Sequence, residues 1–289
     1  MNENRIAFFI IVGVLAFVGI LWYAFENPAL NPRLEEETYT IVRKWDVPTD
    51  LNEISGIRWI SEDKIACVQD EDGIIFIYNL STNLIEKKVN FAKSGDYEAL
   101  TTADSSAFVM ASSGRLFEIE NYLSANFQTK NYQIPFSGKE NIESLTADTL
   151  KNRLLFTVKN KDPNSDEYKG IYAFNLATKE TNSLPVLKIP LNDPIFKPKD
   201  IDDDVEASSS FYPSDIALHP LNGNFYILEG KNPQLLILDS LGKPIKLHKL
   251  LKESFPQPEG ITFAPDGTLY ISNEGRYGTA TILEVEFDE

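Results

Sequence analysis

Five short motifs in the sequence place a carboxylate at the start of a segment rich in apolar and β-branched residues. The motifs read NEISGIRW, DYEALTT, NIESLTA, YPSDIAL and PQPEGIT, and their acids are Glu53, Glu98, Glu143, Asp215 and Glu259. Five carboxylates held together repel one another, so each must be protonated, accept hydrogen bonds from backbone amides, or bind a cation. Oxygen donors without clustered cysteine or histidine favour Ca²⁺ or Mg²⁺ over Zn²⁺ or Cu²⁺. The motifs therefore indicate a divalent-cation site, a set of hydrogen-bonded braces, or a site for an organic ligand.

The spacing of these motifs predicts a repeat architecture. Their acids are separated by 45, 45, 72 and 44 residues, and a four-stranded propeller blade takes about 40–50 residues. Between the motifs lie short alternating segments bounded by turn residues, such as KIACVQD, GIIFIYNL and IEKKVNF after the first. We therefore expect an all-β fold, a five-bladed β-propeller.

The two irregular places in the repeat suggest how the ring closes. The fifth unit lacks an outer strand, and YTIVRKWDVP at residues 39–48 has no blade of its own, so we expect this segment to complete the fifth blade. The long third interval contains an acidic, proline-rich stretch at about residues 191–212 that reads as an inserted loop. A sixth blade in that interval is the alternative.

The first strand of each propeller blade lines the central channel, so the five motif acids are expected to share one rim of the channel as metal ligands. The loop between the second and third strands of each blade should emerge on the same face. Such loops would add oxygen donors from Asp70, Asp72, Asn160, Glu229, Asn273 and Glu274. Calcium, which takes six to eight oxygen ligands, suits a wide ring better than magnesium does.

The N-terminal segment predicts a membrane anchor. Residues 6–25 contain no charge and are long enough for a helix to cross the hydrocarbon core. A cleaved signal peptide is the rival interpretation, but no small-residue cleavage motif follows. We expect a cytoplasmic N-terminus at residues 1–5, a linker at 26–38, and a propeller at 39–289 that faces the periplasm or the cell exterior in a single-pass arrangement.

Composition excludes several functions. The net charge of −16 and the lack of a basic stripe argue against nucleic acid as a partner. His219 is expected to brace a turn on the far face and His248 to lie in an outer strand, so histidine catalysis is not expected. The single Cys67 stands in a strand-like context, which argues against a thiol nucleophile.

The ordered motifs EISGIRW, DYEALTT, NIESLTADTLKNRLLFTVKNKDP, PSDIALHPLNGNFYILEG and QPEGITFAPDGTLYISNEG resemble those of the SdiA-regulated family of membrane-anchored bacterial β-propellers. The resemblance spans about residues 40–287, and this group includes the calcium-regulated β-propeller proteins. It implies an N-terminal anchor, an extracytoplasmic propeller and a link to calcium.

These observations favour a non-enzymatic role in sensing, calcium homeostasis or binding. One alternative is a metal-dependent hydrolase, lactonase-like or phytase-like, that uses the same carboxylates. A phytase would also need basic residues to hold phosphate, and only a few are expected on this face, namely Lys159, Lys161, Lys231 and Arg276. The other alternative is a protein-interaction platform with structural carboxylates. Exposed Tyr97 and Tyr212 beside the ring would favour it, and the other interpretation of these tyrosines is that they pack between blades. A protein or a small molecule is a candidate ligand of the propeller face in either case.

Overall fold

The computed structural model describes residues 13–20, 22–23, 38–136, 138–196, 210–276 and 278–288. The chain divides into two units, residues 1–37 and 38–289. In the first unit residues 13–20 are helical. Within the described ranges, no helix has both the length and the apolar character needed to span a bilayer. Half of the predicted anchor at 6–25, the whole N-terminus at 1–5 and nearly all of the linker lie outside the described residues.

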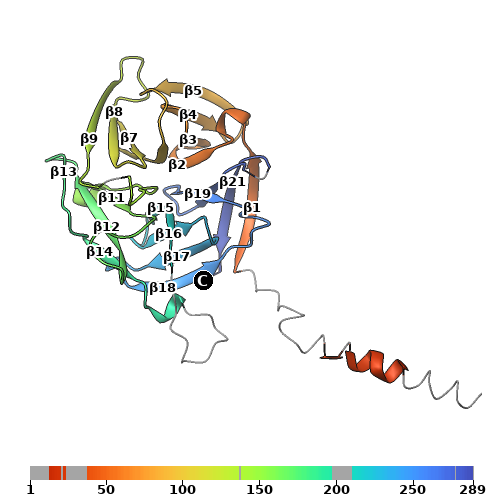
Figure 1. The fold of residues 1–289 in the computed structure, drawn as a ribbon. Helices are drawn as coiled ribbons and strands as arrows, with labels where there is room; N and C mark the ends of the chain where they lie inside the picture. The colour runs from red at the N-terminus through yellow and green to blue at the C-terminus, as the bar shows by residue number, and fades with distance from the viewer. Residues whose placement is uncertain are drawn as a thin grey trace, which may run out of the picture. The chain divides into compact units, whose positions relative to one another are not determined.

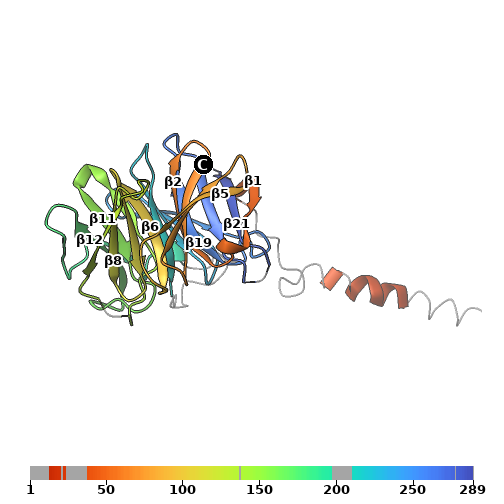
Figure 2. The same cartoon turned by 90° about the horizontal axis from the view of Figure 1, so that it is seen from above.

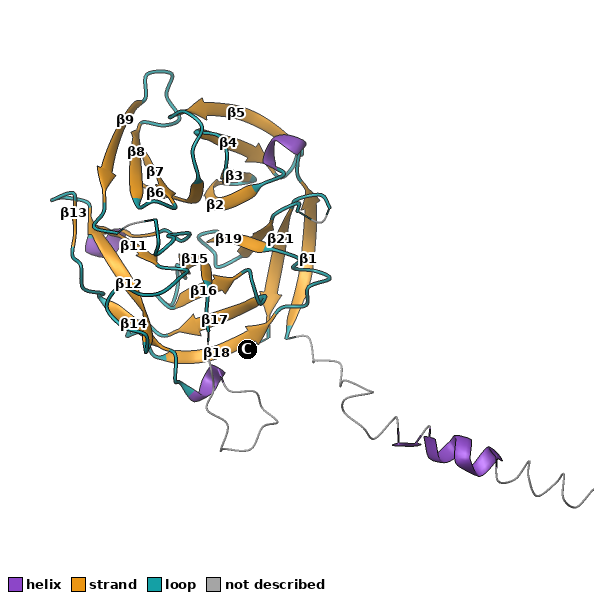
Figure 3. Ribbon diagram, in the orientation of Figure 1, coloured by secondary structure: helices purple, strands orange, loops and turns teal. Residues whose placement is uncertain are grey.

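The second unit is a five-bladed β-propeller, as predicted (Figure 1). Each blade is an antiparallel sheet whose strands run outward from the channel in chain order, except that the N-terminal strand lies outermost in blade five. Figure 3 shows that strands and turns make up nearly all of this unit. Blade one holds β2 (Ile54–Ser61), β3 (Lys64–Gln69), β4 (Ile74–Asn79) and β5 (Leu84–Asn90). Blade two holds β6 (Tyr97–Ala103), β7 (Ser106–Ala111), β8 (Arg115–Glu120) and β9 (Gln128–Gln133). Blade four holds β15 (Pro213–Leu218), β16 (Phe225–Glu229), β17 (Gln234–Leu238) and β18 (Pro244–Lys249).

Blade three has a divided outer edge. Its inner strands are β10 (Thr146–Asp148), β11 (Arg153–Thr157) and β12 (Tyr168–Asn175), and β12 pairs with both β13 (Glu180–Thr181) and β14 (Leu187–Pro190). Short 3₁₀ turns occur at Thr49–Leu51, Thr149–Lys151 and Pro194–Phe196. Between β14 and β15 the described residues form no further sheet. The long interval is therefore an insertion, and the six-bladed alternative is wrong. Residues 197–209 of this insertion lie outside the described residues.

Blade five joins the two ends of the propeller. Its order is β19 (Pro258–Phe263), β20 (Leu269–Asn273), β21 (Thr281–Phe287) and finally β1 (Tyr39–Asp46). Tyr39 pairs with Phe287 and Asp46 with Thr281 in an antiparallel ladder, which confirms the predicted closure. The N-terminal strand thereby covers an edge that would otherwise expose unpaired backbone groups.

Figure 1 looks along the channel and Figure 2 shows the propeller from its edge. Apolar side chains fill the spaces between neighbouring blades. Five clusters of buried residues each join two adjacent blades, including the pair formed by blades five and one. Between blades two and three, for example, Phe136 packs edge-on against Phe156 and Tyr172, with ring centroids 5.7 and 4.7 Å apart. The core is thus a ring of five interfaces that holds the innermost strands around a channel.

Candidate functional site

The innermost strands all begin at the same end of the channel, and four of them begin with a β-bulge. The register shifts between Ile54 and Gly56, and in the same way at the start of β6, β15 and β19. The extra residues are Ser55, Glu98, Ser214 and Glu259. In blade three Glu143 takes the corresponding place, because the Lys159 N–H donates to the carbonyl two residues before it, as the Asp70 N–H does to the carbonyl two residues before Ser55.

The bulges show which predicted acids are equivalent. Glu98, Glu143 and Glu259 share the bulge position, whereas blades one and four have serine there. Glu53 stands two residues before its bulge, and Asp215 stands one residue after its own. Only three of the five motif acids therefore occupy the same position in their blades. The other two were misaligned because the extra residue at a bulge shifts the strand register, and this shift cannot be seen from the acids alone.

The loops between second and third strands lie on the face of the bulges, as expected. Their backbone N–H groups donate to the residue two positions before each bulge: Asp70 to Glu53 (3.3 Å), Ser112 to Asp96 (3.0 Å), Lys159 to Asn141 (2.8 Å) and Glu274 to Gln257 (2.9 Å). Lys159 in blade three is therefore equivalent in position to two acids, Asp70 in blade one and Glu274 in blade five. This difference between the blades places one cation among the carboxylates.

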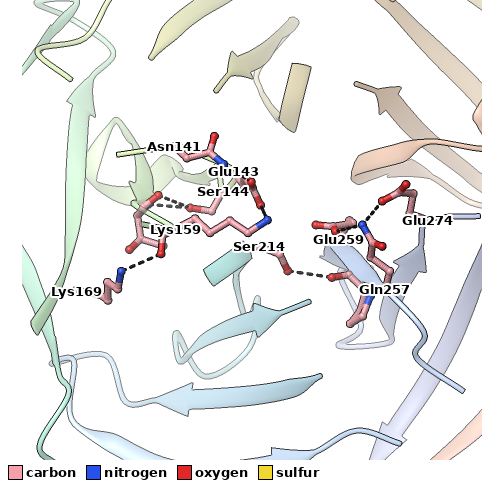
Figure 4. Close-up of polar contacts among 11 residues, drawn as sticks. Asn141, Glu143, Ser144, Lys159, Lys169, Ser214, Gln257, Glu259 and Glu274 are labelled. Atoms are coloured by element: carbon pink, nitrogen blue, oxygen red, sulfur yellow. Dashed lines mark hydrogen bonds and ion pairs between the residues drawn. The ribbon is translucent and has the colours of Figure 1, made fainter. Parts of the chain in front are cut away.

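The three bulge glutamates form an inner group around Lys159. The Lys159 ammonium makes an ion pair with Glu143, which also accepts a hydrogen bond from Asn141 at 2.6 Å (Figure 4). Burial and then the charge of Glu143 raise the pKa of Glu98 to about 9 and that of Glu259 to about 8. Burial alone would lower the pKa of Lys159, but the nearby carboxylates raise it. The inner group is thus neutralised by protons and by one lysine.

A buried lysine fixes the loop that carries Lys159. The Lys169 ammonium donates to the backbone carbonyls of Lys159 (2.8 Å) and Asn160. Only 6% of Lys169 is exposed, and burial lowers its pKa to about 8. Two carbonyls therefore hold this cation, and the loop that bears Lys159 is anchored to β12 beneath it.

An outer group of acids lies at the junction of blades one and five. Burial, then the charges of Glu53 and Glu274, raise the pKa of Asp70 to about 6. Burial also raises the pKa of Glu274, and the charge of Arg276 partly offsets this. The side chain of Gln257 donates to Glu259 at 3.0 Å and to Glu274, so it links the outer and inner groups (Figure 4).

Two further observations concern the blade-one side of the outer group. The Oδ1 atom of Asp70 is buried and accepts no hydrogen bond from the described residues. Glu53 also lines a cavity of about 270 Å³ whose walls include Asp50, Glu71 and Asp72, together with Lys88, which forms an ion pair with Asp50. Asp72 is held there by the Gln69 amide at 3.1 Å. Oxygen atoms thus surround Glu53 on two sides.

Asp215 is a brace between blades. It is 1% exposed; its Oδ1 accepts from the amides of Leu145 in blade three (3.2 Å) and Ile216 (2.8 Å), and its Oδ2 accepts from Ile261 in blade five (2.9 Å). Burial raises its pKa well above the usual range, and the three amides partly offset this shift. Both oxygens are therefore engaged with backbone, which is the bracing role that the sequence left open.

The remaining predicted donors lie on the expected face. Glu229 accepts from Asn232 (2.8 Å) and Gln234 (2.5 Å). Asn160 donates through its amide nitrogen to the Lys139 carbonyl, and Asn273 donates in the same way to Ser254 and Thr281, while the Asn273 Oδ1 atom is buried without a donor among the described residues. Among the described side chains, no group of three or more His, Cys, Asp or Glu residues is already arranged to hold a metal ion.

Residues outside the carboxylate groups behave as their sequence contexts suggest. His219 accepts from the amides of Leu221 (3.2 Å) and Asn222 (3.4 Å) and so braces its turn. Cys67 is fully buried in β3. Tyr97 is 3% exposed and packs between Phe91 and Phe117, while the ring of Tyr212 lies beneath the Lys231 ammonium at 4.0 Å.

Comparison with known proteins gives a family and a fold. A family model described as SdiA-regulated matches residues 33–276, whereas no curated protein matches the sequence. Among solved structures, the chain is similar to Myxococcus xanthus glutaminyl cyclase (TM-score 0.56, 11% identity, 86% of this chain and 96% of that one). It is also similar to an aldose sugar dehydrogenase from Streptomyces coelicolor (TM-score 0.51, 11% identity, 86% and 97%). At such low identity these two structures support the fold alone.

Proposed function

The chain belongs to the SdiA-regulated family, and we propose that it is a non-enzymatic calcium-responsive propeller that binds Ca²⁺ at the acidic mouth of its channel. The resemblance of its motifs to calcium-regulated β-propeller proteins supports this choice of ion. The outer group of Glu53, Asp70 and Glu274 supplies the ligands, with Asp72 and the Glu71 carboxylate beside it. All of these donors are oxygens, which suits a hard cation.

The observation that carries the proposal is the lack of a cationic partner for the blade-one acids of the outer group, whereas Arg276 offsets part of the pKa shift at Glu274. Glu53 and Asp70 form no ion pair with the described residues, and the Oδ1 atom of Asp70 lacks a hydrogen-bond donor. A buried carboxylate oxygen without a partner costs free energy that a bound cation would recover. The inner group differs, because Lys159 already supplies its positive charge.

Calcium would act by drawing two blades together. Glu53 and Asp70 belong to blade one, and Glu274 follows β20 of blade five. Because these acids are not yet arranged as a metal site, binding requires the two loops to adjust, and this adjustment would change the face that a partner contacts. That behaviour suits sensing or calcium-dependent binding of a protein or small molecule.

We propose further that residues 6–25 anchor the chain in the cell membrane and that the propeller lies outside the cytoplasm. The support is the uncharged length of this segment and the acidic composition that follows it. Protease added to intact spheroplasts should digest the propeller. Its protection until the membrane is opened would contradict this orientation.

Calorimetric titration of CaCl₂ into the purified, chelator-treated full-length chain tests the calcium site. We expect saturable binding that is lost in the double variant Glu53→Gln, Glu274→Gln. A matched control, Glu62→Gln with Glu180→Gln, removes two exposed glutamates and should bind like the wild type. Absence of binding at millimolar calcium, or binding that both double variants retain, would contradict the proposed site.

A further inference from the structure

The opposite end of the channel contains a larger cavity, of about 570 Å³. It is lined where the innermost strands of four blades end, at Arg58 and Trp59 of β2, Thr102 of β6, Leu218 of β15 and Phe263 of β19. Ligand pockets in proteins commonly measure about 300–1,000 Å³. Arg58 is five residues along β2 from Glu53, so the cavity lies roughly 15 Å from the acidic mouth at about 3.3 Å per residue.

Arg58 is the one positively charged residue among the described residues that line this cavity. Among the described residues its guanidinium makes one side-chain hydrogen bond, from Nε to Thr102 Oγ1 at 3.4 Å, and no ion pair. The nearby Tyr122 and Asp215 influence its electrostatic environment, but the oxygens of Asp215 are already occupied by backbone amides. An arginine held at low exposure without a carboxylate partner is costly, and an anion that enters the cavity would relieve that cost.

The walls around Arg58 are largely apolar. Trp59 is half-buried, while Phe263 and Tyr122 are 6% and 5% exposed. Trp59 therefore offers the main aromatic surface to a planar ligand, and the other two rings contribute a smaller apolar part of the wall. The one acid in the lining is Asp104, which is exposed in the turn after β6.

The charge balance selects the kind of anion. The described lining contains one cation, Arg58, and one acid, Asp104. A phosphate dianion would need more positive charge than this, and the net charge of −16 also opposes it. A carboxylate matches the planar fork of a single guanidinium.

We propose that this cavity binds a small organic monocarboxylate with a planar apolar body, whose carboxylate pairs with Arg58 and whose body lies against Trp59 and Phe263. The site goes beyond the calcium function, since it uses different residues at the other end of the channel. Its success or failure in a binding test is therefore independent of the calcium titration.

The test compares two probes of nearly equal shape on the full-length chain, benzoate and its neutral amide, benzamide. Calorimetry should show saturable benzoate binding at least about tenfold tighter than that of benzamide, a difference expected for a charge-assisted hydrogen bond. Arg58→Gln should abolish this preference. Arg115→Gln, which removes an exposed arginine at the start of β8, should preserve it.

Three results would overturn the proposal: equal or absent binding of both probes to the wild type, retention of the preference in Arg58→Gln, or binding of inorganic phosphate as tight as that of benzoate. Thermal melting of each variant shows whether it folds. If Arg58→Gln does not fold, the contrast between benzoate and benzamide in the wild type decides the question, with phosphate as the competing anion.

Discussion

Replacing Lys159 by methionine would test how the inner group of carboxylates is stabilised. Methionine keeps the length and apolar stem of lysine but removes the cation that pairs with Glu143. The Glu143 side chain is 6% exposed, so water cannot replace the lost partner. We expect the propeller to lose stability, and to lose more of it at high pH.

The size of the effect follows from the burial of the pair. Removing one partner of a buried ion pair costs about 3–5 kcal/mol, and we expect a value near 3 kcal/mol because water reaches part of Lys159. The Lys159 side chain retains 25% exposure. For a domain of this size, about 2–4 °C per kcal/mol gives a fall in melting temperature of roughly 6–12 °C.

The pH dependence has a defined sign. Glu98 and Glu259 have folded pKa values of about 9 and 8, above their ordinary value of 4.5. Their contribution to stability is therefore fully present below pH 4.5 and is lost as the pH rises through 8–9. The pKa of Glu143 is also raised by burial, and loss of Lys159 raises it further. The deficit of Lys159→Met should thus be small at pH 5 and large at pH 8.

Circular dichroism melting at pH 5 and pH 8 measures this difference. Lys161→Met is the matched control, because Lys161 lies in the same loop and forms an exposed pair with Asp166, so little change is expected. Adding Glu143→Gln to Lys159→Met should restore most of the stability lost at pH 8. A Lys159→Met variant that melts like the wild type at pH 8, or that loses the same amount at both pH values, would refute this reasoning.

Three further predictions concern the outer group and the braces. Calcium affinity, measured by calorimetry, should fall as the pH is lowered from 7 to 5, because protons compete for Asp70 with its pKa of about 6; a pH-independent affinity would exclude Asp70 as a ligand. Asp215→Asn should lower stability by about 1–3 kcal/mol in urea unfolding, because the new side-chain NH₂ group would face a backbone N–H that now donates to a carboxylate oxygen. Glu62→Gln, a change at an exposed position, serves as control. Equal unfolding midpoints for the Asp215→Asn variant and the wild type would contradict the bracing role. Gly56→Ala should cost about 1–3 kcal/mol by the same assay, because its Cβ would lie 2.8 Å from the Leu100 nitrogen, whereas Gly138→Ala meets only an atom at 3.9 Å and should be tolerated.

The fold was largely predictable because its signals are local and repeated. Alternating apolar residues and turns every few positions indicated the strands, and the motif spacing indicated five blades. The closure by residues 39–48 followed from counting strands, since one blade lacked its outer strand. These features depend on hydrophobic periodicity, which a single sequence displays directly.

The candidate site was predicted less completely because it depends on register. Aligning the motifs by their acids placed Glu53 and Asp215 with the others, but the bulges align Ser55 and Ser214 instead. The isoleucine or leucine two residues after each bulge residue would have given the correct alignment. The same alignment carries Lys159 onto the place of Asp70, which reveals the counter-ion of the inner group.

The closure of blade five also sets when the propeller can complete itself during synthesis. Tyr39 pairs with Phe287, 248 positions later, so the first strand made waits for the last. At about 5–20 residues per second, this interval is roughly 12–50 s of translation. Until then, the ring of blades is incomplete on the side of blade five. The apolar faces of the neighbouring blades and the unpaired strand edges stay accessible to chaperones. A chain truncated before β21 would leave β1 without its partner, so even a short C-terminal deletion should send the whole product to proteolysis.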